Sequence, residues 1–179
     1  MCVKKKIDLI IIRLIFLVTN NNNNIRLMEI KLSELDCNDN YYQYFTLLKQ
    51  LTTIDPDTIS KEDFVEHLEL IHSNPLHKII IAKYGENIIG TSTILFEPKF
   101  IHNISYIAHI EDVVVDSKYR NLCVGKRLIE KIIEICKTFM DSRGRKCYKI
   151  ILDSSQSCIE FYKGCGFKVK EQQMALYFD

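Results

Sequence analysis

The chain has 179 residues, 47% of them hydrophobic, which suits a soluble globular protein with one domain and one continuous core. Its 24 basic and 23 acidic residues leave a net charge of +1, and no basic run is interleaved with aromatic residues, so nucleic-acid binding is disfavoured. Seven cysteines without a CxxC pair and five histidines without an HExxH motif argue against a disulfide framework and a metal centre. We expect buried thiols in a reducing compartment.

The first 24 residues differ in composition from the rest of the chain. Lysines at residues 4–6 precede a mostly apolar run over residues 7–18, and asparagines follow at residues 20–24. This order is similar to a signal peptide, but Asp8 and Arg13 interrupt the apolar run, which is also short for a membrane span. We predict an extension outside the fold, with a signal or anchor as the alternative. The expected location is cytoplasmic, with membrane or secretory-pathway association left open.

A domain over residues 25–179 follows, and its first half combines one strand with two helices. Residues 25–30 alternate as a strand does, and a polar connection follows over residues 33–40. Helical spacing predicts a helix over residues 41–51. A second helix begins near Ser60, which with Asp63 has the form of a helix cap. The residues that mark its inner face are Phe64, Leu68 and Ile71, and Pro75 ends the helical region.

The second half is rich in strands. Three strands in succession indicate an antiparallel meander, and a long helix and an almost wholly apolar strand come after it. The expected ranges are strands at 77–83, 87–96 and 109–115, a helix at 125–140, a strand at 147–152, a helix at 157–164 and final strands at 167–170 and 173–178. This order predicts an α/β (α+β) fold with a mixed central sheet flanked by helices on both faces.

The junction from residue 111 to residue 126, EDVVVDSKYRNLCVGK, joins a buried strand to the start of the long helix. Unpaired N–H groups and the positive end of the helix dipole attract an anion there, and Arg120 lies five residues before Gly125. The junction lacks the Walker pattern and the three glycines of a dinucleotide fold. Taken alone, it fits a phosphate site and an ordinary strand-loop-helix connection equally well.

Several sequence blocks together resemble a known family. RNLCVGK after EDVVV, with FYKGCGF at residues 161–167, resembles the GNAT superfamily of acetyl-coenzyme A-dependent N-acetyltransferases. The blocks LKQLTT, KFIH, HIEDVVV and CYKIILD resemble its glucosamine 6-phosphate N-acetyltransferases, over about residues 25–178. The resemblance implies the GNAT fold, acetyl transfer from acetyl-CoA to glucosamine 6-phosphate for UDP-N-acetylglucosamine synthesis, a homodimer and no metal.

The resemblance also implies a coenzyme site. The backbone of the strand at residues 113–115 pairs with the pantetheine arm, while Arg120 and the loop amides surround the pyrophosphate. The implied residues are Val113, Val114, Val115, Arg120, Asn121, Leu122, Cys123, Val124, Gly125 and Lys126. Ordinary core burial of the valines is compatible with this role, because the backbone makes the contact.

An acceptor site is implied as well. A hexosamine phosphate needs cations for its phosphate and carboxylates for its ammonium and hydroxyls. The implied residues are Thr52, Lys99, Phe100, Ile101, His102, Glu111, Asp112, Tyr148, Lys149 and Asp153. Glu111 is expected to draw off the amine proton, directly or through water, and Asp112 to position the substrate. Tyr162 is expected to hydrogen-bond or protonate the leaving thiolate; without the resemblance, its position next to Phe161 predicts a core tyrosine.

Some positions depart from the family pattern. Relatives usually carry glycine at the position of Cys123 and often at that of Asn121, and asparagine is common at Cys158. They also carry an arginine near the end of the last strand, where this chain has Leu176 and Tyr177. A peptide N-acetyltransferase of the same fold and a non-catalytic coenzyme A-binding protein therefore remain alternatives.

Overall fold

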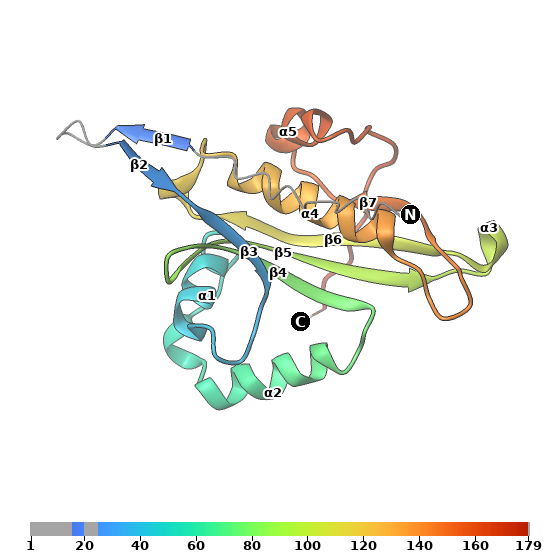
Figure 1. Cartoon of the computed structure of the whole chain (residues 1–179). Coiled ribbons are helices and arrows are strands. Elements are labelled where there is room, and N and C mark those ends of the chain that lie inside the picture. Colours follow the sequence, from blue (N-terminus) through green and yellow to red (C-terminus); the bar gives the residue numbers. More distant parts are fainter. Residues whose placement is uncertain (1–15, 20–24, 179) are drawn as a thin grey trace, which may run out of the picture.

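A computed structural model describes residues 16–19 and 25–178 of the chain and contains a five-stranded mixed sheet (Figure 1). The strands, in spatial order, are β3 (Ile30–Glu34), β4 (His77–Tyr84), β5 (Asn87–Pro98), β6 (Tyr106–Val115) and β7 (Cys147–Leu152). Neighbours from β3 to β6 are antiparallel, whereas β7 runs parallel to β6. The predicted meander and mixed sheet are confirmed.

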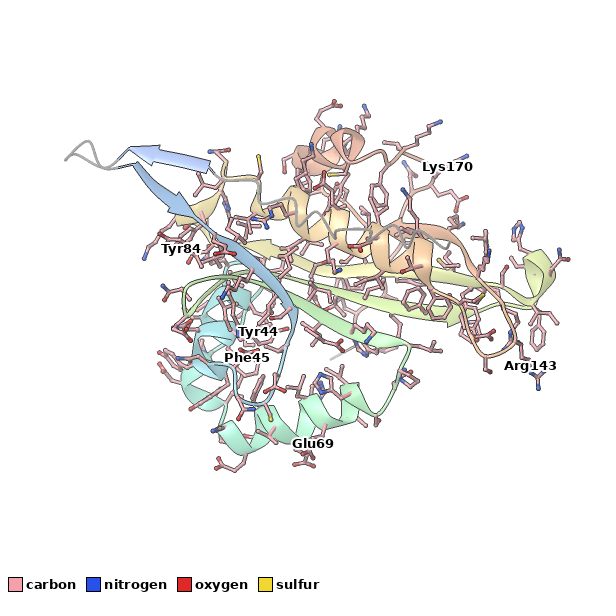
Figure 2. The ribbon with its side chains drawn as sticks, viewed as in Figure 1. Tyr44, Phe45, Glu69, Tyr84, Arg143 and Lys170 are labelled. Atoms are coloured by element: carbon pink, nitrogen blue, oxygen red, sulfur yellow. The ribbon has the colours of Figure 1, made fainter. Side chains whose placement is uncertain are left out.

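Helices cover both faces of this sheet, as predicted (Figure 1). One face carries α1 (Tyr41–Leu48) and α2 (Lys61–His72), and the other carries α4 (Val124–Thr138) and α5 (Ile159–Gly164). Each face has its own apolar cluster: Leu47, Phe64 and Leu68 pack on the α1/α2 side, and Leu128 and Ile132 pack on the α4 side. Figure 2 shows Tyr44 and Phe45 on α1, with Glu69 on the outer side of α2.

Short turns connect these elements. They are η1 (Pro56–Thr58), α3 (Ile101–Ile104), η2 (Ser117–Tyr119) and η3 (Gln156–Cys158). The α3 turn lies at the far tip of β5 and β6 (Figure 1). Strands β5 and β6 are longer than predicted, because they pair with each other as far as Pro98 and Tyr106 at this tip.

The start of α2 is closed by its own side chains. The Ser60 Oγ accepts from the Asp63 N–H at 3.0 Å, and the Asp63 Oδ2 accepts from the Ser60 N–H at 3.1 Å. This reciprocal pair is the predicted cap, and it satisfies two groups that a helix start leaves unpaired.

The beginning of the domain differs from the prediction of one strand over residues 25–30. Residues Ile25–Met28 form β2, which pairs with β1 (Phe16–Thr19) in a separate two-stranded sheet, and β3 continues to Glu34. Polar Ser33 and Glu34 are tolerated there because β3 is an edge strand. Residues 1–15 and 20–24, on which most of the signal-or-anchor hypothesis depends, lie outside the described residues. No helix in the described part is long and apolar enough to cross a membrane.

The prediction of final strands at residues 167–170 and 173–178 is wrong for the single chain, since residues 168–178 form no strand. Met174 and Phe178 are exposed, and Figure 2 shows Lys170 extending from this segment. The apolar pattern is that of a strand, but a strand also needs a neighbour for its N–H and C=O groups.

Candidate active site

Strand β6 has two halves with different neighbours. Its pairing with β7 ends at Ile110 and Leu152, whereas its pairing with β5 continues to Val115. From Glu111 onward, no described strand lies on the β7 side of β6, so main-chain groups are open to a ligand there. A β-bulge lies at the same place, because two residues of β6 oppose the single residue Ser92 of β5, and Asp112 has a φ of +51°.

The start of α4 is open, in contrast to that of α2. Its N-cap residue, Cys123, has a φ of +57°, and no side chain in the described part of the chain caps the helix. Asn121 also has a positive φ, of +67°, so the two positions where relatives carry glycine both adopt left-handed backbone. The first amides of α4 can therefore bind an anion, as the pyrophosphate of a coenzyme requires, and the exposed Lys126 adds a positive charge.

Helix α5 packs directly over this helix start. A Cβ at Gly125 would lie 3.3 Å from the Phe161 Cζ and 3.5 Å from the Val115 Cγ2, so glycine allows the close approach. The connecting loop is tied back to β6, because the Arg120 Nε donates to the Val115 carbonyl at 3.2 Å. Tyr162 follows Phe161 on α5 and packs against the apolar cluster on this face of the sheet.

Tyr162 is half-buried, with its ring 5.0 Å from that of Phe161 in an edge-on arrangement. Burial, with smaller contributions from Cys158 and Cys165, raises the pKa of Tyr162 to about 12. No described residue forms a hydrogen bond with its hydroxyl. The phenol therefore keeps its proton at neutral pH and can donate it.

Three carboxylates gather where β6 and β7 separate. The pKa of Glu111 is raised by burial, then by the negative charges of Asp153 and Asp112, and the charge of His109 opposes this shift. The Asp153 Oδ2 accepts a hydrogen bond from the Gln173 Nε2 at 2.6 Å. Glu111 is thus a partly desolvated base in an acidic environment, which suits binding and deprotonation of an ammonium group.

Cations gather further along the same strands. Glu97 and Lys149 lie on either side of Ile107, in one row across β5, β6 and β7. Glu97 forms an ion pair with Lys99, and its Oε2 lies 2.9 Å from the His109 Nε2. Both contacts lower the pKa of Glu97, and the contact with Lys99 lowers it more than the contact with His109 does.

The predicted His102 and Tyr148 also meet at this end. Their ring centroids lie 4.1 Å apart, and the Lys149 Nζ lies 5.9 Å from the Tyr148 ring centre. His102 reaches this position from α3, whose backbone has positive φ at His102, Asn103 and Ile104. The structure therefore brings together His102, Tyr148 and Lys149, while Lys99 forms its ion pair with Glu97.

A model of the acetyltransferase (GNAT) family matches residues 41–167 of the chain. The chain belongs to the GNAT acetyltransferase family. It is 35% identical over 152 residues to glucosamine 6-phosphate N-acetyltransferase of Arabidopsis thaliana, covering 83% of this chain and 97% of the relative. It is 36% identical over 151 residues to glucosamine 6-phosphate N-acetyltransferase 1 of Dictyostelium discoideum, covering 83% and 90%. These relatives belong to the group that the sequence blocks predicted, the glucosamine 6-phosphate N-acetyltransferases.

Solved structures agree with this assignment. The crystal structure of the Arabidopsis thaliana enzyme matches the acetyltransferase with a TM-score of 0.75 and 36% identity, covering 84% of this chain and 99% of that one. The predicted GNAT fold is confirmed, and the acetyl donor of this acetyltransferase, as a member of the GNAT family, is acetyl-CoA.

Not every predicted site residue of the acetyltransferase lies in these clusters. Thr52 is in the loop after α1, where the Gln50 Oε1 accepts from the Ser117 N–H at 2.9 Å. Phe100, 94% exposed, and Ile101 point to solvent at the tip of the hairpin. Conversely, the sequence did not predict that Glu97 and His109 lie in the cluster of charged side chains. Alternation along HIEDVVV was the available signal, since it places His109 on the same strand face as Glu111.

Proposed function

We propose that the acetyltransferase moves the acetyl group of acetyl-CoA to the amine of D-glucosamine 6-phosphate, giving N-acetyl-D-glucosamine 6-phosphate and CoA for UDP-N-acetylglucosamine synthesis. The observation that carries this proposal is the separation of charge along β6. Carboxylates lie around Glu111, whereas further along the sheet Glu97 links Lys99 to His109, and Lys149 lies beside Ile107. At about 3.3 Å per residue, these positions are roughly 7 and 13 Å from Glu111. An amino sugar with an ammonium at one end of its ring and a phosphate at the other fits the nearer of these spacings.

The donor is held mainly by main-chain groups in this proposal. The open edge of β6 from Val113 to Val115 pairs with the pantetheine arm, as a further strand would. The uncapped amides of residues 124–126 bind the pyrophosphate, and Arg120 and Lys126 add positive charge. The acyl end then lies beside the bulge at Asp112.

Each chemical step has a group suited to it. Glu111 takes the proton from the substrate ammonium, and Asp112 orients the sugar. The freed amine attacks the thioester carbonyl, whose oxygen accepts a hydrogen bond from a main-chain amide near Val113. Tyr162 gives its proton to the departing thiolate, because its raised pKa keeps it protonated until that moment. No covalent intermediate with the enzyme is needed.

One assay tests the proposal. The purified full chain is given acetyl-CoA with glucosamine 6-phosphate, with glucosamine or with a mixed peptide pool, and free thiol is recorded. Rapid thiol release only with the phosphorylated sugar is the expected result. Release with peptides would favour a peptide N-acetyltransferase, and coenzyme binding without release would favour a non-catalytic protein.

We also propose that the acetyltransferase is a homodimer. Strand β7 is the last strand of the described sheet, and residues 168–178 expose Val169, Met174, Leu176, Tyr177 and Phe178. A second copy supplies the strand neighbour that these residues lack within one chain. Sedimentation of the full chain should give the mass of two copies. A chain shortened after Lys168 should sediment as a monomer, and a monomeric full chain would refute the proposal.

A further inference from the structure

The lysine proposed to bind the sugar phosphate already has an anion beside it. The Lys99 Nζ forms an ion pair with the Glu97 Oε1, while the Glu97 Oε2 lies 2.9 Å from the His109 Nε2. Lys99 directly follows β5, and its N–H donates to the Ser105 carbonyl at 2.8 Å, which fixes its backbone beside the start of β6. Building on the proposed function, we infer that Glu97 is the resident counter-ion of Lys99 and that the phosphate of the acceptor displaces it.

The Lys99–Glu97 ion pair is of a kind that a phosphate can displace. The two side chains are 32% and 40% exposed, and an ion pair in contact with water contributes little stability. A phosphate monoester carries about −1.5 to −2 charges at neutral pH and has three strong acceptor oxygens, whereas a carboxylate carries a single negative charge. The phosphate is therefore the stronger partner for the Lys99 ammonium.

Glu97 keeps a second partner when Lys99 turns to the phosphate. Its two carboxylate oxygens have separate contacts, since Oε1 faces Lys99 and Oε2 faces the His109 ring. Loss of the first contact therefore leaves the carboxylate with its contact to His109, so its charge is not isolated. The two contacts also lower the pKa of Glu97, which keeps the carboxylate ionised at neutral pH.

A resident counter-ion weakens the binding of every anion at this end of the site. Inorganic phosphate, which has no other group to contribute, then binds poorly. The amino sugar also brings an ammonium group, which the carboxylates around Glu111 attract, so it still binds. Glu97 thus prevents free phosphate from filling the site, while an acceptor that contacts both ends is retained.

Titration of the full chain with inorganic phosphate, followed by NMR, tests the exchange without turnover. Glu97→Gln removes the negative charge and keeps an oxygen that can accept from the His109 ring. We expect the Kd for inorganic phosphate to be roughly threefold lower in this variant than in wild type, and the difference should shrink in about 1 M salt. Glu134→Gln, which breaks the exposed Lys131–Glu134 pair on α4, is the matched control and should leave this Kd unchanged. Equal or weaker phosphate binding by Glu97→Gln would overturn the inference, as would no phosphate binding by either protein.

The part played by Lys99 is tested by repeating the comparison in Lys99→Met. With no ammonium to release, Glu97→Gln should change the Kd for phosphate by less than about 1.5-fold in this background. Loss of measurable phosphate binding from both Lys99→Met proteins would also support exchange at Lys99. A gain of roughly threefold in the Lys99→Met background would show a general effect of negative charge and would refute the exchange.

Thiol release separates the exchange from the proposed reaction. In Glu97→Gln, the KM for glucosamine 6-phosphate should fall by roughly threefold, whereas the KM for unphosphorylated glucosamine should change by less than about 1.5-fold. A disturbed fold weakens binding, so a lower KM is not explained by a merely structural role of Glu97. A wild type that binds phosphate but releases no thiol with the sugar phosphate would refute the proposed function. An active Glu97→Gln with an unchanged or raised KM would refute the counter-ion alone.

Discussion

The proposed donor side and the proposed acceptor side of the site differ, because the first consists mainly of main-chain groups and the second mainly of charged side chains. On the donor side, the open edge of β6 and the uncapped start of α4 present main-chain groups, and left-handed backbone at Asn121 and Cys123 shapes the loop. On the acceptor side, charged side chains of β5, β6 and β7 project from one sheet face. Substitutions that change a side-chain charge should therefore weaken the acceptor side. Substitutions that change the preferred backbone conformation of a residue should instead affect the donor side.

Replacing the proposed base should have the largest effect. We expect Glu111→Gln to lower kcat by about a hundredfold or more, because the amide cannot take the amine proton. The folded environment raises the pKa of Glu111, so the base form is lost as pH falls through a value above the ordinary range of glutamate. The wild-type rate should fall there, and the variant should lack this acid limb. Thiol-release assays across pH measure both, with the exposed Glu86→Gln as control.

Removing the Lys99 charge should affect substrate selection more than chemistry. We expect Lys99→Met to raise the KM for glucosamine 6-phosphate by about tenfold, since a charge-assisted contact with the phosphate is lost. The slow reaction with unphosphorylated glucosamine should be unchanged. Lys61→Met, on the surface of α2, is the control. An equal change for both sugars would remove Lys99 from the phosphate end.

Tyr162 is the proposed proton donor to the thiolate of coenzyme A. Tyr162→Phe should lower kcat by about tenfold and leave the KM for the sugar unchanged, because only the proton for the thiolate is lost. With a pKa of about 12, Tyr162 should cause no loss of rate below roughly pH 10. Tyr42→Phe, which removes a hydrogen bond to Asp57 instead, is the matched control. Full activity of Tyr162→Phe would exclude this role.

The smallest effect should come from relieving backbone strain on the donor side. Cys123→Gly should stabilise the protein by about 1 kcal/mol, or roughly 2–4 °C in Tm, because glycine adopts a φ of +57° without strain. Cys123→Ala should give no gain, since alanine has the same restriction. Thermal unfolding distinguishes the two. Equal Tm values for both variants would show that the left-handed conformation carries no cost.

Local patterns predicted much of the fold. The Ser60 cap, the inner face of α2 and the meander of β4, β5 and β6 all follow from residues close together in the chain. The resemblance singled out Asn121 and Cys123 as positions where relatives carry glycine, and both have a positive φ. The bulge at Asp112 and the contact of Phe161 with Gly125 were not predictable, because each depends on an element distant in sequence.

The sequence by itself determined the order and type of most elements and the family, because helix and strand periodicities and short blocks are local properties of the chain. It also indicated a strand at the end of the chain that one copy does not form, since strand pairing needs a partner. Only the tertiary structure decided where β6 and β7 separate and that the side chains of Glu97 and His109 meet beside the proposed acceptor side. These arrangements depend on register and packing between distant segments, which no local pattern encodes.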